Sequence, residues 1–452
     1  MPDNDIVQSD IDIQNAGPTR AGFGLALLLT HDAPWGDLVR GYEDASDAVT
    51  DGFDSDHPVV RGLRAMFSQN PKPPLVLVGR VAAAVTQRYE IIVNDAEDVE
   101  YTLDLAGHGF EDAEISVTPE NGDDEADIAG DLITALNAVP DKNYTAEVDG
   151  TDPNMIIVTV SAPGEWLSIA GPNPSRGLLS IRQTHTVSDV DLHGDLDAIK
   201  EINDDWYLLL THFNSPDYAG DCAEWCAANG KAYAFDVVDN DTILDAYVDG
   251  VTDDVGSQQL ALGYSGVMGS HHHSPAEFFS HAWMGEWLTS LPGQANPAWR
   301  PLEGVTPTLL TATQRTNLLA RRMNYYRRAY QQSFTWEGMV FSTTYKWIDV
   351  RRNEDWLNDA IATNVVGVLA GGDVGCDAPG IQAIGGGVES ALAEGVEQGA
   401  LVNAPKYTLQ LPEPEAVSAS DKSERALRKI KWNATIRSFI NKVVPIKGTL
   451  TF

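Results

Sequence analysis

The sequence predicts an α/β fold (α+β overall), and three patterns support that class. Residues 206–211 and 232–237 are short apolar runs typical of buried strands, and residues 218–229 between them have helical spacing. A strand, a helix and a second strand in this order predict a right-handed parallel crossover. Residues 89–177 differ in composition, because strand patterns and acidic loops surround one amphipathic helix. We therefore expect an α/β core that carries a small inserted α+β domain.

The remaining elements of the N-terminal half follow from short local patterns. Residues 57–69 have helical spacing and end at two proline-containing breaks. The other segments expected to be strands are 22–29, 75–79, 89–93, 99–103 and 146–160, and the other expected helices are 127–139 and 195–202.

Residues 336–369 organise the C-terminal half. Residues 345–350 are rich in aromatic and β-branched residues, which predicts a strand. Asn353 then supplies an N-cap, and Glu354 and Asp355 place negative charge in the first turn of a helix. Apolar residues follow at spacings of four, four and three, so we expect this helix to bury one face.

Two further predicted helices are basic. Residues 314–331 place apolar residues on one helix face and arginines on the opposite one. An arginine face in an acidic protein implies an acidic surface opposite it, within the same molecule or on another copy. The alternative is a solvated basic face, because exposed ion pairs contribute little. Residues 421–441 are expected to form the last helix, where basic charge concentrates.

The net charge is the most unusual property of the chain. Thirty basic and 66 acidic residues give a formal charge of −36. Such a surface repels nucleic acid and anionic membranes, which argues against both as partners. It also destabilises a compact fold by self-repulsion unless salt screens it, so we expect a salt-loving host. The alternative is an acidic mesophilic protein.

Targeting signals and nucleotide-binding motifs are not found. No apolar run reaches the length of a membrane span, and the acidic first residues do not resemble a secretory signal, so we expect cytoplasmic assembly. No G-x-G-x-x-G follows a predicted strand and no Walker loop is present, so no nucleotide cofactor is expected. Residues 263–267, GYSGV, nearly match the nucleophile elbow G-x-S-x-G, but Val267 replaces the required glycine.

Three groups of metal-ligating side chains have simpler interpretations. His271, His272, His273 and His281 are mostly consecutive and point in different directions, which favours a polar loop. Asp123, Asp124 and Asp127 lack the order and the glycine of an EF-hand, which favours a solvated acidic face. Cys222 and Cys226 stand four apart in a predicted helix, which favours a reduced core. No metal site is therefore expected.

Four segments, in the same order along the chain, resemble contractile phage tail sheath proteins. Residues 347–361, WIDVRRNEDWLNDAI, are similar to the segment that opens the C-terminal core domain of that family. Residues 67–80, FSQNPKPPLVLVGR, resemble an earlier element of the family in which a helix ends and a strand continues. The segments 391–402 and 422–452 resemble its closing helices and last strand. Only about residues 94–180, the predicted insertion, lie outside the resemblance.

The resemblance implies inner α/β core domains of the tail sheath type, an inserted small α+β outer domain, and extended N- and C-terminal strand arms. It also implies a structural protein without enzymatic activity or cofactor. The expected divisions are an N-terminal arm (1–18), a first part of the core (19–88), the inserted domain (89–177), a middle core region (178–335), a C-terminal core domain (336–441) and a C-terminal arm (442–452).

By the same resemblance, subunits polymerise into a helical tube around a tail tube and contract to drive that tube through the host envelope. The implied partners are other copies of the chain, in rings that are hexameric in the family, and the tail tube, baseplate and tail terminator proteins. The implied location is the tail of a virion. Neither nucleic acid binding nor membrane insertion is expected.

Three sets of residues are candidates for these contacts. The tube-contact candidates are Lys422, Arg425, Arg428, Lys429 and Lys431. The candidates for strand pairing between subunits are Ile6, Val7, Ile11, Ile13, Val443, Val444, Ile446 and Leu450. The candidates for charge pairing between subunits are Arg315, Arg321, Arg322 and Arg328.

Two functions of other classes stay open at this point. One is an acidic α/β hydrolase of a salt-loving organism that uses Ser265 and a histidine. The other is a binding module such as an adhesin or surface-layer protein, which would require export.

Overall fold

The computed structural model describes residues 22–82, 85–171, 177–187, 191–212, 215–238 and 242–442. These residues form two compact units. The larger unit comprises described residues within 22–356, 398–401 and 436–442, and the smaller unit comprises residues 357–397 and 402–435. The smaller unit lies within the range 336–441 that was predicted for a C-terminal core domain, and the full domain division stays a prediction.

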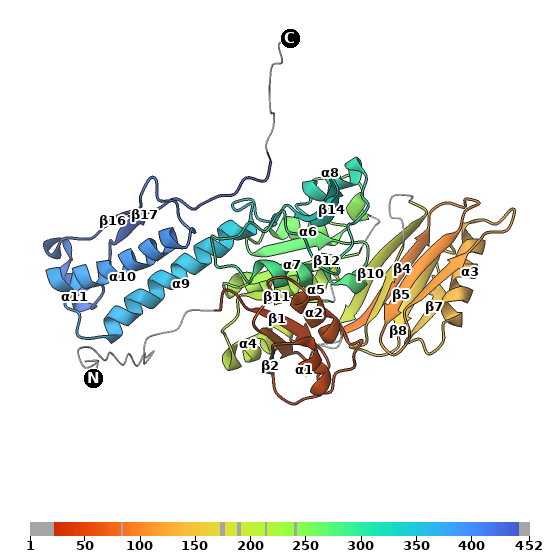
Figure 1. Cartoon of the computed structure of the whole chain (residues 1–452), viewed down its shortest axis with the longest axis horizontal. Helices are drawn as coiled ribbons and strands as arrows, with labels where there is room; N and C mark the ends of the chain where they lie inside the picture. The colour runs from red at the N-terminus through yellow and green to blue at the C-terminus, as the bar shows by residue number, and fades with distance from the viewer. Residues whose placement is uncertain are drawn as a thin grey trace, which may run out of the picture. The chain divides into compact units, whose positions relative to one another are not determined.

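An eight-stranded sheet forms the centre of the larger unit (Figure 1). Six neighbouring strands are parallel, and an antiparallel strand closes each edge. The strands, in spatial order, are β15 (Gln332–Trp336), β14 (Asn324–Ala329), β13 (Val267–His271), β12 (Ala232–Val237), β11 (Leu208–Leu210), β1 (Ala26–Thr30), β3 (Val76–Arg80) and β2 (Val39–Tyr42). The predicted parallel crossover between β11 and β12 is therefore confirmed.

Helices pack on both faces of this sheet. On one face, Leu27 of β1 and Leu209 of β11 share an apolar cluster with side chains from three helices. These helices are α4 (Leu192–Ile202), α5 (Pro216–Ala228) and α6 (Val255–Leu262). Leu28 points to the other face, since a Cβ on Gly62 of α2 (Pro58–Phe67) would lie 3.3 Å from its Cδ2. The other helices of the larger unit are α1 (Ala45–Thr50), α7 (Phe279–Trp287) and α8 (Ala312–Ala320).

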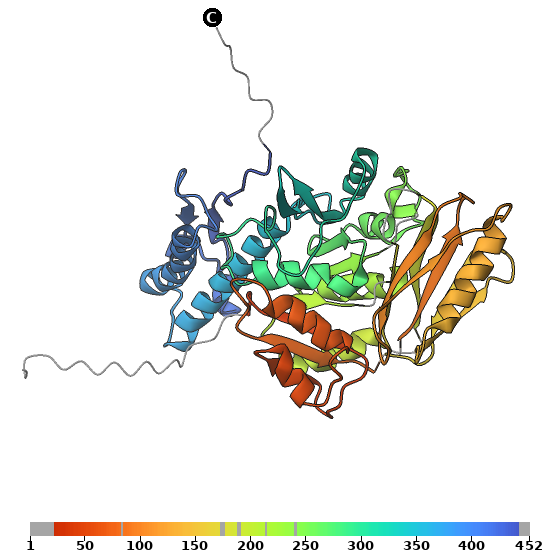
Figure 2. The ribbon, with the colours of Figure 1, turned by 45° about the vertical axis from the view of Figure 1, so that its right-hand side comes forward.

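The inserted region has a hydrophobic core of its own. Two antiparallel sheets and one helix, α3 (Glu125–Ala138), share a cluster that includes Tyr89, Ile128, Leu132 and Ile156. Figure 2 shows α3 along one side of these strands. The strands are β4 (Val85–Val93), β5 (Tyr101–Gly107), β6 (Ala113–Val117), β7 (Tyr144–Val148), β8 (Met155–Val160), β9 (Leu167–Ala170) and β10 (Leu179–Val187).

The smaller unit is built on two helices and a short two-stranded ribbon. It contains most of α9 (Ile348–Ala370) and all of α10 (Ala378–Glu397). After α10 come β16 (Thr408–Gln410), α11 (Ala419–Ser423) and β17 (Lys431–Asn433). β16 and β17 pair antiparallel, with Leu409 opposite Trp432.

Three predicted elements are wrong. The helix expected at 314–331 ends at Ala320, because Arg322 has a φ of +58° and the residues after it join the parallel sheet as β14. The strand expected at 345–350 is one bridge, Met339 to Trp347, and α9 begins at Ile348, so Asn353 lies inside the helix rather than at its N-cap. The helix expected at 421–441 stops at Ser423, since Arg425 and Lys429 have φ values of +53° and +70°, which interrupt a right-handed helix.

The first turns of α9 are held by a buried arginine. The Nη2 of Arg352 donates to the carbonyl oxygens of Phe23 at 2.8 Å, Leu288 at 3.2 Å and Ser290 at 2.8 Å. The guanidinium also lies 4.7 Å from the centre of the Trp287 ring. Burial lowers the pKa of Arg352 to about 10, which leaves it charged at neutral pH. The start of α9 is thereby joined to the segment before β1 and to the segment after α7.

Asp349, one turn earlier, gives a pH-dependent prediction. Burial raises its pKa to about 6, so the folded state is stabilised relative to the unfolded state below pH 4 and loses that stabilisation as the pH rises to about 6. Asp349→Asn keeps a side-chain oxygen without the charge. At pH 7 the variant should be more stable than the wild type by roughly 2–3 kcal/mol, and the difference should vanish below pH 4. Urea unfolding across this range checks the prediction, and parallel stability curves would contradict it.

Candidate functional site

The near match to a nucleophile elbow has the wrong architecture. Ser265 follows α6 and precedes β13, so the chain runs from helix to strand at this point. A nucleophile elbow requires a strand that turns into a helix, which exposes the serine at the end of the sheet. Gly263, with a φ of +72°, is the C-cap of α6. The motif is therefore a helix end, and nothing in it supports a hydrolase.

His272 and His273 lie in a loop after β13, as predicted, whereas His271 ends that strand and His281 is in α7; all but the half-buried His273 are buried. The ring nitrogens of His272 lie 2.9 Å from the carbonyl oxygen of Ser274 and 2.8 Å from that of Thr306. His271 ends the buried strand β13, and His273 is half-buried. Burial lowers the pKa values of His273 and His281 to about 3, so both are neutral at physiological pH. His272 and His273 join the end of β13 to the loop that contains Thr306 and Thr308.

Metal and thiol chemistry find no support in the described residues. Within those ranges, no group of three His, Cys, Asp or Glu side chains has the arrangement of a metal site. Asp124 caps α3 and forms a capping box with Asp127, which explains the acidic cluster as a helix start. Cys222 and Cys226 are buried free thiols in α5, where burial raises the pKa of each, while Cys376 is exposed. No described helix is long and apolar enough to cross a membrane.

The tube-contact candidates do not share one helix face. Lys422 is in α11, Lys431 is in β17, and the other three lie in the irregular segment between them, but all five are exposed. Arg428 already pairs with Asp421, and with Glu424 at 2.9 Å. The exposed ion pair between Arg428 and Glu424 contributes little to the free energy of folding.

The charge-pairing candidates separate into buried and accessible side chains. Arg321 is 2% exposed, and its Nε donates to Asp254 at 2.7 Å, so its counter-charge lies within the same subunit and it does not reach a neighbouring one. Arg315 is half-buried and donates to the Leu310 carbonyl oxygen at 2.5 Å. Arg322 is also half-buried, whereas Arg328 on β14 is exposed. Contacts of the last three with another subunit stay predictions.

The candidates for strand pairing lie outside the described residues. These are Ile6, Val7, Ile11, Ile13, Val443, Val444, Ile446 and Leu450.

The smaller unit contains a two-stranded ribbon that could accept such strands. β16 and β17 have three residues each and pair only with each other among the described strands. All of β17 is exposed. A ribbon this short is marginally stable alone and presents unpaired backbone groups at its outer edges. The alternation of Tyr407, Leu409 and Leu411 is the signal in the sequence that could have predicted β16.

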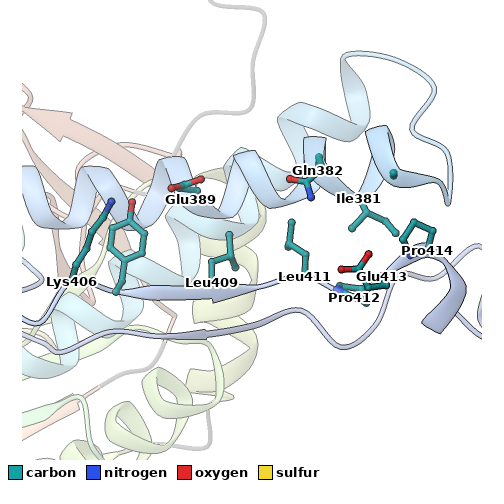
Figure 3. A pocket seen from close by; sticks show the side chains of 11 residues that line it. Ile381, Gln382, Glu389, Lys406, Leu409, Leu411, Pro412, Glu413 and Pro414 are labelled. Atoms are coloured by element: carbon teal, nitrogen blue, oxygen red, sulfur yellow. The ribbon is translucent and has the colours of Figure 1, made fainter.

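Two grooves flank this ribbon. The first, of about 490 Å³, lies between α10 and the segment that contains β16. Figure 3 shows Leu409 and Leu411 pointing from that segment toward α10, with Glu389 and Lys406 at one end of the groove. The second, of about 420 Å³, is mainly apolar and has Val365, Ile384 and Trp432 in its wall together with Arg425. The smaller unit thus combines open strand edges, apolar hollows and exposed basic side chains.

A clamp fixes the chain in the larger unit just before residue 443. Lys442 forms an ion pair with Glu337, which is 2% exposed, and its ammonium lies 5.3 Å from the ring centre of Trp336. Asn441 accepts a hydrogen bond from Asn296 at 2.6 Å and donates to the Glu337 carbonyl oxygen at 3.3 Å. The sequence contains no local signal for this clamp, because its partners are more than 100 residues apart.

Comparison with known proteins finds solved structures with a similar fold. No family model matches the chain, and no curated protein matches it significantly. A chain of the anti-feeding prophage baseplate is 13% identical with a TM-score of 0.52, and the match covers 100% of both chains. A chain of the same baseplate in its contracted state is 11% identical with a TM-score of 0.51, covering 100% of this chain and 98% of that one.

A third similar structure comes from the sheath complex of an extracellular contractile injection system, PVC, in its contracted state. It is 8% identical with a TM-score of 0.50, and the match covers 98% of this chain and 96% of that one. The likeness therefore extends along the whole chain, including the insertion. The sheath-type α/β fold expected from the resemblance is confirmed.

The clamp gives a prediction about stability. Lys442→Ala leaves the Glu337 carboxylate buried without its ammonium partner, and because Lys442 is half-exposed we expect a loss of about 2 kcal/mol, below the full cost of breaking a buried pair. The double variant Glu337→Gln/Lys442→Ala removes the buried charge and should recover most of that loss. Urea unfolding of the wild type, Lys442→Ala, Glu337→Gln and the double variant checks this, and additive effects of the two substitutions would contradict a direct interaction.

Proposed function

We propose that this chain is the structural subunit of a contractile tail sheath. The observation that carries the proposal is the match, from end to end, with a chain of a contractile injection sheath complex. The open β16–β17 ribbon supports it independently, because a domain that leaves strand edges unpaired invites strands from other chains. The work proposed is mechanical, so no catalytic group or cofactor is needed.

Assembly would proceed by strand exchange between copies. The N-terminal segment 1–18 alternates acidic and apolar residues at 10–13, and the C-terminal segment from 443 onward is rich in apolar and β-branched residues. We propose that both add to β16–β17 ribbons of neighbouring copies, where main-chain hydrogen bonds provide affinity and alternate side chains provide register. The basic residues near β17 suit the acidic N-terminal segment. Head-to-tail contacts of this kind generate an open helical tube, proposed to stack from hexameric rings.

Contraction would be a change of lattice rather than of fold. The extended tube is proposed to be a metastable packing, and contraction a rigid-body rotation and sliding of subunits into a packing of lower energy. The clamp at Asn441 and Lys442 keeps the root of the C-terminal segment on the body while other faces exchange contacts. The proposed partners are a tail tube protein, which would meet Lys422, Arg425, Arg428, Lys429 and Lys431, and baseplate and terminator proteins. The proposed setting is the tail of a virion that is assembled in host cytoplasm and ejects its genome into a cell.

The first test is polymerisation of the purified chain. Electron microscopy should show hollow tubes for the wild type and none for a variant that lacks residues 1–17, because the donated strand is gone. Ile11→Pro is the matched variant, since it keeps length and charge but removes a backbone donor, and it should also assemble poorly. A wild type that stays monomeric at all concentrations would contradict the proposed sheath function. Normal tubes from the deletion variant would contradict strand donation by the N-terminal segment but not the sheath function.

The charge of −36 predicts that the subunit itself requires salt. At about 1 M salt the Debye length is about 3 Å, so repulsion among carboxylates is screened, whereas in millimolar salt it is not. We expect the midpoint of thermal unfolding, followed by circular dichroism, to fall steeply as salt is removed. A midpoint that does not change between 1 M and 10 mM salt would contradict the proposed salt-loving host.

A further inference from the structure

The turn that joins β14 to β15 is built from unusual residues. Ala329 and Gln332 pair across the ribbon, so the turn consists of Tyr330 and Gln331 alone. Their φ values are +47° and +65°, in the left-handed region. Two-residue hairpin turns with positive φ at both positions favour asparagine and glycine, because a bulky side chain is strained there. Tyr330 is therefore a poor choice for forming the turn.

The fold of the subunit gains nothing visible from the Tyr330 ring. The side chain is fully exposed, at 101% of its reference area, so it buries no surface that would offset the strain. Because no contact within the described part of the subunit offsets the backbone strain at Tyr330, we look for a role of this side chain in binding another molecule. Tyrosine is also among the residues most enriched at the centre of protein interfaces.

Two arginines of β14, Arg327 and Arg328, lie close to this tip. Arg328 is exposed one residue before Ala329, and it lies on the opposite face of the ribbon from Arg327. The guanidinium carbon of Arg327 lies 5.2 Å from the ring centre of Trp336 and 5.7 Å from that of Phe334. Trp299, 47% exposed, stacks on Phe334 at 4.3 Å. The end of the hairpin is therefore a positive, aromatic surface that is supported from behind by stacked rings.

We infer that this hairpin tip, centred on Tyr330 and Arg328, docks onto an acidic surface of a second copy of the chain. The inference rests on the proposed function, because it requires self-assembly. Charge complementarity identifies the partner: each copy carries 66 acidic against 30 basic residues, so a basic protrusion meets its complement on another copy. The tyrosine ring would supply buried contact area, and Arg328 would supply charge-assisted hydrogen bonds to carboxylates.

The turn itself offers a matched pair of variants. Tyr330→Gly and Gln331→Gly each place glycine at a left-handed position, so both should raise the thermal midpoint of the subunit by a similar amount. Only Tyr330→Gly removes the ring. We expect it to raise the protein concentration needed for self-association at least tenfold, measured by sedimentation, while Gln331→Gly leaves that concentration unchanged. Arg328→Glu should weaken association as much or more, and its effect should shrink as salt is raised.

Each outcome is informative. Equal self-association of Tyr330→Gly, Gln331→Gly and the wild type would overturn the inference while leaving the sheath proposal intact. Loss of binding to a tube protein with unchanged self-association would also overturn it, because the partner would then be a different protein. A wild type that never self-associates would contradict both the inference and the proposed function.

Discussion

The guanidinium of Arg352 is the constraint on which the larger unit depends. A buried charge is costly unless hydrogen bonds replace its water, and here three carbonyl oxygens do so. They come from the segment before β1 and from the segment after α7, so Nη2 of the arginine makes all three hydrogen bonds only when both segments and the start of α9 are in place. Nearby, Arg351 pairs with Asp355 at 2.6 Å, and the Tyr207 hydroxyl donates to Asp355 at 2.9 Å. The beginning of α9 thereby has one fixed position on the sheet, before the helix continues into the smaller unit.

Predictions from the sequence succeeded where a local pattern decides the structure. The predicted strand 232–237 coincides with β12, and α3 differs from its prediction by two residues at its start and one at its end, because an apolar run and apolar helical spacing are visible in a few residues. The start was misplaced because the capping box of Asp124 and Asp127 was interpreted as a solvated acidic face. They failed where tertiary contacts override the pattern. Met323 and Tyr326 suit a helix face, yet Met323 lies just before β14 and Tyr326 lies within that strand, and both side chains are buried in the larger unit. The partner of Arg321, Asp254, lies 67 residues away, so its burial had no local signal. The exposed ribbon was missed because its two strands are short and far apart in the chain.

Polar groups have different environments in different parts of the molecule. In the larger unit several are satisfied internally: His272 Nδ1 accepts from the Ser274 amide at 3.2 Å, its Nε2 lies 2.8 Å from the Thr306 carbonyl oxygen, and Asn324 donates to Gly269 and Met339 at 2.9 Å each. In the smaller unit and at the β14–β15 turn, strand edges, basic side chains and an aromatic ring face solvent. Groups that are paired inside the larger unit support its fold, whereas the exposed groups are available to neighbouring molecules.

The clamp at Asn441 and Lys442 determines where a mechanical load would enter the subunit. A pull on the chain beyond residue 442 would reach Glu337, Trp336 and Asn296 first, and through Trp336 it would reach the paired strands β14 and β15. Force would therefore be spread over a ladder of hydrogen bonds near the edge of the large sheet instead of peeling the final segment away one bond at a time. Tension would thus end at the sheet, and the weak ribbon of the smaller unit would be spared.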